Sequence, residues 1–383
     1  MTTPTDDPIY LDYNATTPLL PAVLDAMLPY LRAHFGNPSS DHVYGRRAHD
    51  AVERARAQVA SLLRCDPDEV VFTSGGTEAN NLALRGALDA LPLPHHVVTS
   101  SVEHPATAAP LAWLESRGAR VTRIGLDPEG RLRLDEARAA VAGGASLVTV
   151  IHAHNETGVL QPLAELVRAA KAVGALVHTD AAQSIGKVAL DVRALGVDLL
   201  SFAGHKLYAP KGVGALYVRR GTAFAPFARG AGHERGLRPG TENVASLVGL
   251  GVACDLAARD LDASAARITA LRDRLWTALA AGVPGLVCNG GGAARLPNTL
   301  SVRFPGVTGA AVLAGAPEVA ASTASACHAG SAQAPAVVLA MGVAPEEAVG
   351  TVRLSLGRGT SDDDVARAAE ALVRAWRGAR SSG

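Results

Sequence analysis

Lys206 is the residue of this chain with the clearest potential for chemistry. It ends the stretch Leu199 to Lys206, in which an apolar run of strand length is followed by Gly204, His205 and the lysine. An amine just after a buried strand of an α/β protein lies at the sheet edge where such proteins bind ligands. Lysine can form a Schiff base and arginine cannot, so a lysine at this position can serve as a reactive amine. Taken alone, however, this stretch is explained more simply by a capping or ion-paired lysine.

Two further stretches carry groups that such an amine would need beside it. Ser74 to Thr77 is a Gly-Gly turn before an expected helix, where N–H groups and the Thr77 hydroxyl can bind an anion, although most such turns only cap a helix. Asp180 ends an apolar run and could cap the next turn or lie at the sheet edge. An anion turn, a strand-end carboxylate and a strand-end lysine are together the three parts that pyridoxal phosphate requires.

A regular alternation of strands and helices positions these groups. It predicts an α/β fold with a mostly parallel sheet covered by helices on both faces. The expected strands are Val70–Thr73, Val97–Ser100, Val121–Ile124, Leu147–Ile151, Ala175–Thr179, Leu199–Phe202 and Ala215–Val218, and the expected helices are Ala79–Leu88, Pro105–Ser116, Leu134–Val141 and Leu163–Val173.

The two ends of the chain follow different patterns. The opening, with a strand and turn from Tyr10 to Pro18, is expected to lie across the main domain. Its helices are expected at Leu19–His34 and Arg47–Leu63. From about Asn243 the pattern predicts a smaller α+β domain. Its expected elements are a long helix to about Ala281, strand Asn298–Phe304, helices near Gly309 and Pro335, a strand around Arg353–Leu356 and the amphipathic helix Asp362–Arg377.

Composition excludes several classes of protein. The 383 residues are 48% hydrophobic with a formal net charge of zero, so neither nucleic acid nor an anionic membrane is expected as the main partner. No apolar stretch is long enough to cross a membrane, and the polar segment Met1 to Asp7 lacks a hydrophobic signal, so a cytoplasmic protein is expected. The four cysteines form no CxxC pair, so neither a zinc ribbon nor a disulfide framework is indicated.

Short motifs along nearly the whole chain carry a resemblance to a known family. They are Tyr10 to Pro18, Gly36 to Ser40, Thr73 to Glu78, Val102 to His104, Asn155 to Gly158, His178 to Gln183, Gly204 to Lys206, Gly232 to Arg235, Arg238 to Asn243, Ser325 to Cys327 and Arg353 to Arg358. In this order they resemble the cysteine desulfurases of the class V aminotransferase fold, the NifS- and IscS-like enzymes, and are also similar to selenocysteine lyase. The resemblance implies the fold type I of pyridoxal phosphate enzymes.

That fold implies two domains. A large domain, residues 19–244, would hold the coenzyme on a mostly parallel seven-stranded sheet. A small domain would combine residues 1–18 with residues 245–383.

The resemblance also implies a role for each matching residue. Lys206 would hold pyridoxal 5′-phosphate and move protons, Asp180 would pair with the ring nitrogen, and His104 would stack on the ring. The remaining implied roles are hydrogen bonds to the ring oxygen from Asn155 and Gln183, phosphate binding by Gly76, Thr77 and His205, phosphate binding by Thr241 from the second subunit of a homodimer, and substrate-carboxylate binding by Asn37 and Arg353.

The implied reaction converts L-cysteine to L-alanine. Cys327 would attack the substrate sulfur, become a persulfide and pass the sulfur to an acceptor protein, such as a cluster scaffold or a sulfur carrier, for iron–sulfur cluster or thio-cofactor biosynthesis. A thiol with this task must be ionised and mobile. Residues 320–334 are mostly small and have neither helical nor strand period, so Cys327 is expected on an exposed loop.

The remaining cysteines and histidines are interpreted as structural. Cys65, Cys254 and Cys288 lie at a helix end, in an apolar stripe and after an apolar run, where thiols are usually inert. His152 and His154 would share one face of a strand, but no third ligand is obvious and no metal is expected.

Three departures from the family bear on the exact activity. Ala203 replaces a serine that often contacts the phosphate, His154 replaces an asparagine, and the loop from Cys327 to Pro335 is one residue longer than in most iron–sulfur desulfurases. This longer loop favours selenocysteine lyase, whereas the tail from Gly350 to Arg358 favours bacterial desulfurases. A class V aminotransferase that ignores Cys327 and a non-enzymatic scaffold also stay open as interpretations of the chain.

Overall fold

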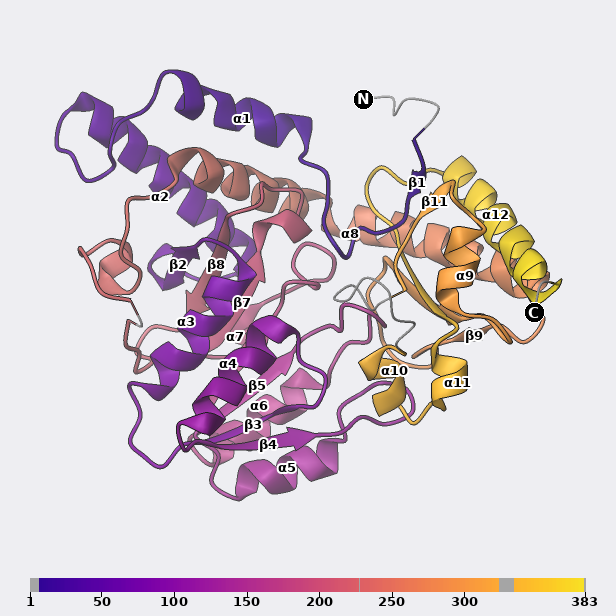
Figure 1. Ribbon diagram of the computed structural model, residues 1–383. Helices are drawn as coiled ribbons and strands as arrows, with labels where there is room; N and C mark the ends of the chain where they lie inside the picture. The colour runs from indigo at the N-terminus through magenta and orange to yellow at the C-terminus, as the bar shows by residue number, and fades with distance from the viewer. Residues whose placement is uncertain (1–6, 227, 324–333, 382–383) are drawn as a thin grey trace.

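A computed structural model describes residues 7–226, 228–323 and 334–381. Cys327 and its neighbours therefore lie outside the described residues. Figure 1 shows a larger sheet-and-helix part joined to a smaller part that contains both ends of the described chain.

A seven-stranded sheet forms the centre of the larger part. Its strands lie in the order β2 (Val70–Thr73), β8 (Gly214–Val218), β7 (Leu199–Ala203), β6 (Leu176–Asp180), β5 (Leu147–Ile151), β3 (His96–Ser100) and β4 (Arg120–Ile124). Only β8 runs antiparallel to its neighbours, which confirms the predicted mostly parallel sheet. The carboxyl ends of the six remaining strands consequently meet at one edge.

Alternation along the strands divides the apolar side chains between two helical layers. Val71 packs with Leu82 on one face, whereas Phe72 packs on the opposite face. A sheet buried on both faces needs such apolar residues at every position. The helices of the first face are α3 (Gly76–Leu88) and α4 (Pro105–Ser116), and those of the second are α2 (Val43–Leu63), α5 (Leu134–Ala142) and α6 (Leu163–Ala172).

The helix α8 (Val244–Gly282) connects the two parts of the molecule (Figure 1). Its first turns, around Leu250, belong to the core under the large sheet, where α1 (Pro21–Arg32) and α2 also pack. Its later turns, around Leu275, belong to a second core. One continuous helix of 39 residues therefore fixes the two cores relative to each other.

The smaller part has its own antiparallel sheet and helices. The sheet order is β12 (Thr351–Ser355), β10 (Thr299–Arg303) and β9 (Val287–Cys288), and a second pair joins β1 (Ile9–Tyr10) to β11 (Val319–Ala320) in parallel. Its helices are α9 (Gly309–Ala314), α10 (Ala336–Ala340), α11 (Pro345–Ala348) and α12 (Asp362–Ser381). Ile9 and Leu11 are buried in this second core, so the opening of the chain packs here first.

Residues 14–17 then carry the chain from the smaller to the larger part and are called the crossing segment. Asn14 forms hydrogen bonds to both parts: its N–H donates to the Ser355 hydroxyl in the smaller part, and its carbonyl accepts from Gln183 in the larger part. The Thr17 N–H donates to the His205 carbonyl at 3.0 Å. The expectation that the opening lies across the main domain therefore describes only its later residues. The domain boundaries at residues 18/19 and 244/245 stay a prediction. None of the described helices is both long and apolar enough to span a bilayer.

Candidate active site

A cleft of about 380 Å³ lies at the carboxyl edge of the large sheet. It collects residues from the loops that follow five strands, from the crossing segment and from β12. Its lining residues are Asn14, Ala15, Gly76, Thr77, Asn80, His104, Ala106, Ile151, Asn155, Asp180, Ala182, Gln183, Ala203, His205, Lys206 and Arg353. Most of the site residues predicted from the sequence are among them.

Lys206 lies in a single 3₁₀ turn, Gly204–Lys206, that begins where β7 ends. Its amine donates hydrogen bonds to the carbonyls of Asn14 at 2.6 Å and Ala15 at 2.8 Å. Burial, followed by the charge of Arg353, lowers the pKa of Lys206 to about 8. A lysine with such a pKa has an appreciable neutral, nucleophilic fraction near neutral pH. Among the described residues no carboxylate forms a salt bridge with it, so the ion-paired interpretation finds no support there.

Asp180 is the last residue of β6 and is 3% exposed. Its Oδ1 accepts from the Ala182 N–H at 2.9 Å, so the residue does cap the following turn. Its Oδ2 accepts from Nδ2 of Asn80 at 2.8 Å. Two N–H donors suit an ionised carboxylate. The capping and site interpretations are therefore both correct, because this carboxylate also lines the cleft.

The N-terminus of α3 forms another part of the cleft lining. Gly75 has φ of 146°, a value that side-chain-bearing residues rarely adopt, and Gly76 is so close to Ala203 that a Cβ would lie 3.3 Å from the alanine Cβ. Gly76 and Thr77 both line the cleft at this point. The N–H groups and partial positive charge of a helix start favour an anion such as phosphate.

His205 precedes Lys206 in the same 3₁₀ turn and lines the same cleft. Its Nδ1 is 3.2 Å from the Thr16 hydroxyl. Burial, followed by the charge of Lys206, lowers the pKa of His205 to about 4, so the ring is neutral at physiological pH.

His104 forms part of the cleft wall at the start of α4. Its Nδ1 accepts from the Ala106 N–H at 3.1 Å, so the neutral ring carries its proton on Nε2. Desolvation lowers its pKa, and Asp180 acts in the opposite direction. A neutral ring that carries an Nε2–H can stack on a flat ligand and can also move a proton.

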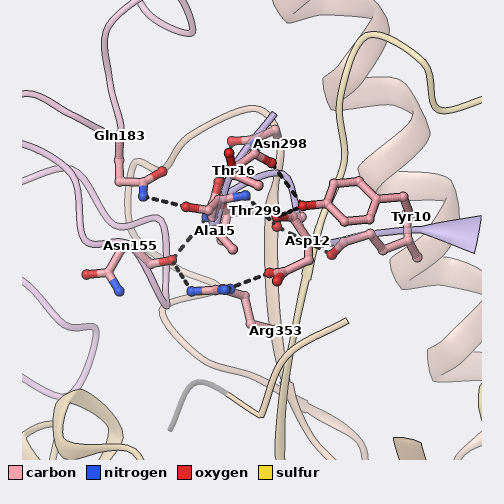
Figure 2. Close-up of polar contacts among 12 residues, drawn as sticks. Tyr10, Asp12, Ala15, Thr16, Asn155, Gln183, Asn298, Thr299 and Arg353 are labelled. Carbon is pink, nitrogen blue, oxygen red and sulfur yellow. Dashed lines mark hydrogen bonds and ion pairs between the residues drawn. The ribbon is translucent and has the colours of Figure 1, made fainter. Parts of the chain in front are cut away.

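Arg353 brings a buried guanidinium from β12 to the cleft. Figure 2 shows it between Asp12, whose Oδ1 accepts at 2.7 Å, and the Asn155 carbonyl, which accepts at 3.2 Å. Its Nε is buried without a hydrogen-bond partner among the described residues. Arginine binds a carboxylate through two parallel N–H groups. With its Nε–H still available, Arg353 can therefore bind one carboxylate.

Sequence reasoning did not select Asn14, which lines the cleft, or Lys187, which supports the cleft through Asn14 and Gln183 without lining it. Asn14 accepts from the Lys187 amine at Oδ1 (3.0 Å) and from Gln183 Nε2 at its carbonyl (3.0 Å). Gln183 Oε1 accepts from the same lysine at 3.1 Å. Burial lowers the pKa of Lys187 to about 7. The only sequence signal for Asn14 was that it lies in the stretch Tyr10 to Pro18, which resembles the family. Its partners Gln183 and Lys187 are far away in sequence, so the contacts themselves could not be predicted.

Two predicted site residues are not brought to this cleft within one chain. Asn37 is exposed in the loop between α1 and α2, where its Oδ1 accepts from the Ser39 N–H. Thr241 is exposed just before α8. Neither is among the lining residues, so their roles stay predictions, and Thr241 was expected from a second subunit. Cys327, the predicted sulfur acceptor, falls outside the described residues.

Two of the three described thiols are in settings that disfavour reactivity. Burial raises the pKa of Cys65 to about 12 and also raises that of Cys254, which is fully buried. These two positions accord with a structural interpretation. Cys288 is half-buried, and its Sγ accepts from Arg295 Nη1 at 2.8 Å, so its structural interpretation stays a prediction.

His152 and His154 have separate hydrogen-bond partners. His152 Nδ1 lies 2.9 Å from the Ser184 hydroxyl. His154 donates from Nε2 to the Val102 carbonyl at 3.1 Å and accepts from the Glu156 N–H at Nδ1. The departure at His154 thus serves to connect two loops of the cleft wall, and within the described ranges no group of three metal-binding side chains occurs.

The residues present fit pyridoxal phosphate. The amine lies in the turn that follows β7, the carboxylate ends the neighbouring strand β6, and a helix N-terminus with a close-packed glycine lines the same cleft. The Nε of Arg353, which has no partner among the described residues, adds a site for a substrate carboxylate. This donor set has the groups that the coenzyme and an amino acid require.

Comparison with known proteins identifies the family. The family model described as "Aminotransferase class-V" matches residues 9–368. A cysteine desulfurase of Trichormus azollae is 43% identical over 366 residues, which cover 95% of this chain and 92% of that protein.

Solved structures agree with this assignment. A structure titled as a NifS-like protein superimposes with a TM-score of 0.89 and 34% identity, covering 96% of this chain and 98% of that chain. A structure titled "SspA in complex with cysteine" has a TM-score of 0.80 and 35% identity, covering 91% and 98% of the two chains. The chain therefore belongs to the class V aminotransferase family, within which it is similar to cysteine desulfurases.

Proposed function

We propose that this chain is a pyridoxal 5′-phosphate-dependent cysteine desulfurase that converts L-cysteine to L-alanine and transfers the sulfur to Cys327. The observation that carries the proposal is the convergence of Lys206, Asp180 and the α3 N-terminus on one cleft that also holds Arg353. The relative named cysteine desulfurase and the neighbour titled as a cysteine complex support the same substrate.

The coenzyme, when bound, supplies an electron sink that weakens bonds at the Cα and Cβ of an amino acid. Lys206 would hold its aldehyde carbon, Asp180 would accept from its ring N–H, and Gly76, Thr77 and His205 would bind its phosphate. Ala203 offers no hydroxyl to that phosphate.

The walls of the cleft would fix the ring. His104 would stack on one face, and Asn155 and Gln183 would donate to the ring oxygen. Gln183 is already held by Asn14 and Lys187, so its orientation depends on the crossing segment.

Lys206 is suited to move protons near neutral pH. With a pKa of about 8 it can accept the Cα proton as a neutral amine and return a proton to the product carbon. Its confinement between two backbone carbonyls keeps the amine at the cleft.

Arg353 would bind the substrate carboxylate with help from Asn37. Its Nε is unpartnered among the described residues, and its Nη atoms are held by Asp12 and Asn155, so the guanidinium is oriented before substrate arrives. Pre-oriented donors lose less entropy on binding.

Cys327 would take the sulfur. Its thiolate attacks the sulfur of the substrate, the C–S bond breaks, and the carbon receives a proton. The balance is L-cysteine plus enzyme thiol giving L-alanine plus enzyme persulfide. The persulfide sulfur would then pass to an acceptor protein, with iron–sulfur cluster assembly as the proposed use.

A homodimer in the cytoplasm completes the proposal. Thr241 would reach the phosphate of the neighbouring subunit, which accords with its exposure outside the cleft of its own chain.

The test is a product assay on the purified chain loaded with coenzyme. L-cysteine should yield equal amounts of L-alanine and protein persulfide, and Lys206→Ala should abolish both products and the covalent attachment of the coenzyme, read by mass after borohydride reduction. Cys327→Ser should keep coenzyme binding and lose persulfide. A wild-type chain that binds coenzyme but yields neither alanine nor persulfide from cysteine would overturn the proposal.

One sequence feature favours a second candidate, selenocysteine lyase, because the loop after Cys327 is one residue longer than in most iron–sulfur desulfurases. Parallel kinetics on L-cysteine and L-selenocysteine decide between them. A plain aminotransferase would instead retain its activity in Cys327→Ser, and a scaffold would remain colourless with coenzyme.

A further inference from the structure

A continuous row of buried polar side chains leads away from the cleft behind Asp180. Thr149 on β5 lies opposite His178 on β6 in the register, and Ser201 on β7 lies opposite Asp180. Thr149, His178 and Ser201 are 0% exposed, and Asn80 on α3 is 1% exposed. Of these four residues only Asn80 touches the cleft.

Each member of the row is within hydrogen-bond distance of the next. The Thr149 hydroxyl lies 2.8 Å from Nδ1 of His178, whose Nε2 lies 3.1 Å from the Ser201 hydroxyl. The Ser201 hydroxyl is 2.5 Å from Oδ1 of Asn80, and Asn80 Nδ2 is 2.8 Å from Oδ2 of Asp180. The row therefore consists of four successive bonds that end on a carboxylate.

The direction of every bond follows from the last one. A carboxylate only accepts, so Asn80 must donate through Nδ2 and present its Oδ1 to Ser201. Ser201 has one proton and gives it to Asn80, so it must accept from Nε2–H of His178. His178 then accepts at Nδ1 from Thr149. All four donors thus point toward Asp180, and bonds aligned in this way strengthen one another.

His178 must be neutral for this arrangement, because a charged imidazole would donate from both nitrogens. Burial lowers the pKa of His178 to about 3, and no charged group contributes to that shift. The charge of Asp180 influences the pKa of three other titratable groups, Glu103, His104 and Lys206. Glu103 is itself buried, which raises its pKa to about 8.

We propose that Thr149, His178, Ser201 and Asn80 form a one-directional hydrogen-bond relay that holds Asp180 as an oriented carboxylate, with His178 as its central positioning residue. The proposal rests on the proposed function, because Asp180 acts there as the partner of the coenzyme ring nitrogen. Without the relay, the Asn80 amide can rotate, and Oδ2 of Asp180 then loses the N–H donor that orients it. A carboxylate that is free to turn holds the ring charge less well.

The first test measures coenzyme binding and absorbance in variants of the relay. Ser201→Ala and His178→Phe should weaken coenzyme affinity by roughly tenfold, the size expected for losing one hydrogen bond that supports a charged group. They should also raise the pH midpoint of the bound coenzyme's absorbance change. A ring whose positive charge is held less well withdraws less electron density from the nitrogen that joins Lys206 to the coenzyme, so that nitrogen keeps its proton to higher pH. His178→Gln keeps an N–H donor toward Ser201, so its coenzyme affinity and its absorbance midpoint should both be close to those of the wild type.

His96→Phe is the matched control. His96 is also a buried histidine on a strand, 6% exposed and bonded to the Thr122 hydroxyl at 2.9 Å, but it starts β3 and so lies at the other edge of the sheet. It should lose stability as His178→Phe does while leaving the absorbance midpoint unchanged. If the relay variants lose only stability, as this control does, the relay is purely structural and the proposal is overturned.

The second test needs no coenzyme. Nitrogen NMR of histidine-labelled, coenzyme-free chain, with the His178 signals assigned by their loss in His178→Gln, should show a neutral ring protonated on Nε2 down to about pH 5, well above the pKa that burial gives this ring. Protonation on Nδ1 alone would reverse the relay, and a ring charged throughout that range would donate to Thr149 as well as to Ser201. Either result would overturn the proposal. If wild-type chain forms no coenzyme band at all, the proposed function fails, while this spectrum still decides the direction of the relay.

Discussion

At the scale of single residues, burial and the surrounding charges together set the pKa of Lys206. Burial and Arg353 both lower its pKa, while Asp180 and Asp12 act in the opposite direction. Arg353 in turn is held by Asp12, so the group that would bind the substrate carboxylate also adjusts the amine that would bind the coenzyme. Substrate binding at Arg353 would partly neutralise it and thereby make Lys206 a stronger base when its proton is needed.

The pH dependence of coenzyme attachment to Lys206 follows from this balance. Neutral amine is the reactive form, so the attachment rate in coenzyme-free chain should rise with pH through a midpoint of about 8 and level off above it. Arg353→Gln removes a charge that lowers the pKa, so its midpoint should move to higher pH. Stopped-flow absorbance over a pH series measures both midpoints.

Arg303→Gln is the control for that series. Arg303 lies on β10, next to β12, and donates to Asn289 Oδ1 at 2.8 Å, but its charge is not among those that shift Lys206. Its midpoint should equal that of the wild type. A midpoint in Arg353→Gln at or below the wild-type value would contradict the assigned cause.

At the scale of elements, the sequence predicted most of what is seen. Sequence pattern located all seven strands of the large sheet within about two residues. Most of these strands are largely apolar because both of their faces are buried, whereas the edge strand β4 carries two arginines and is only partly buried. The residue at which a helix begins was harder to predict. The second helix begins at Val43, before the expected Arg47, because His42 accepts from the Gly45 N–H and caps an earlier turn.

Contacts between distant elements were predicted only where a strand end or a family motif marks the residues. Lys206, Asp180, His104 and Arg353 were selected because strand ends and family motifs mark them, and all four line the cleft. Lys187 shows no such local signal, since its importance comes from Asn14, which is 173 positions away. Periodicity describes which face a residue lies on, but it does not describe which remote segment covers that face.

Asn14 is accordingly the best place to test the crossing segment. Its side chain bonds Asn155, Thr299, Lys187 and Asn298, so Asn14→Ala should lower the free energy of unfolding by about 2–4 kcal/mol, the range for disrupting a buried polar network. It should also weaken coenzyme binding, because Gln183 and Lys206 are held through the same segment. Urea unfolding of the coenzyme-free chain measures the first effect.

Asn81→Ala provides the comparison for that measurement. Asn81 makes one bond to the Thr77 carbonyl from the surface of α3, so its removal should change stability by no more than about 0.5 kcal/mol. An equal loss in the two variants would show that the crossing segment contributes little to holding the site together.

At the scale of the whole molecule, α8 and the crossing segment tie two cores to one cleft. Each core has its own apolar cluster, and the cleft takes Lys206 and Asp180 from the sheet of one and Arg353 from the sheet of the other. Thr241 and Asn37 remain outside this arrangement in a single chain. All the residues predicted to contact the coenzyme ring therefore line the cleft of one chain, whereas Thr241, which is predicted to contact the phosphate, does not.

Hybrid dimers test whether a second copy supplies Thr241. Thr241→Asp should repel the phosphate of the neighbouring cleft by like charge, and Lys206→Ala should inactivate its own cleft. If Thr241 acts across the dimer, refolding the two inactive variants together places both defects in one cleft of each hybrid and leaves the other intact. Random pairing then restores about a quarter of wild-type desulfurase activity.

A pairing of Lys206→Ala with Asp180→Ala is the control, because both residues line the same cleft of one chain. Each cleft of that hybrid keeps one defect, so no activity should return. If the Thr241→Asp mixture also stays inactive although mixed dimers are present by native mass spectrometry, then Thr241 serves its own chain and the shared phosphate site is wrong. Restored activity would instead make pairing of two chains a condition for catalysis, since neither copy would hold a complete phosphate site alone.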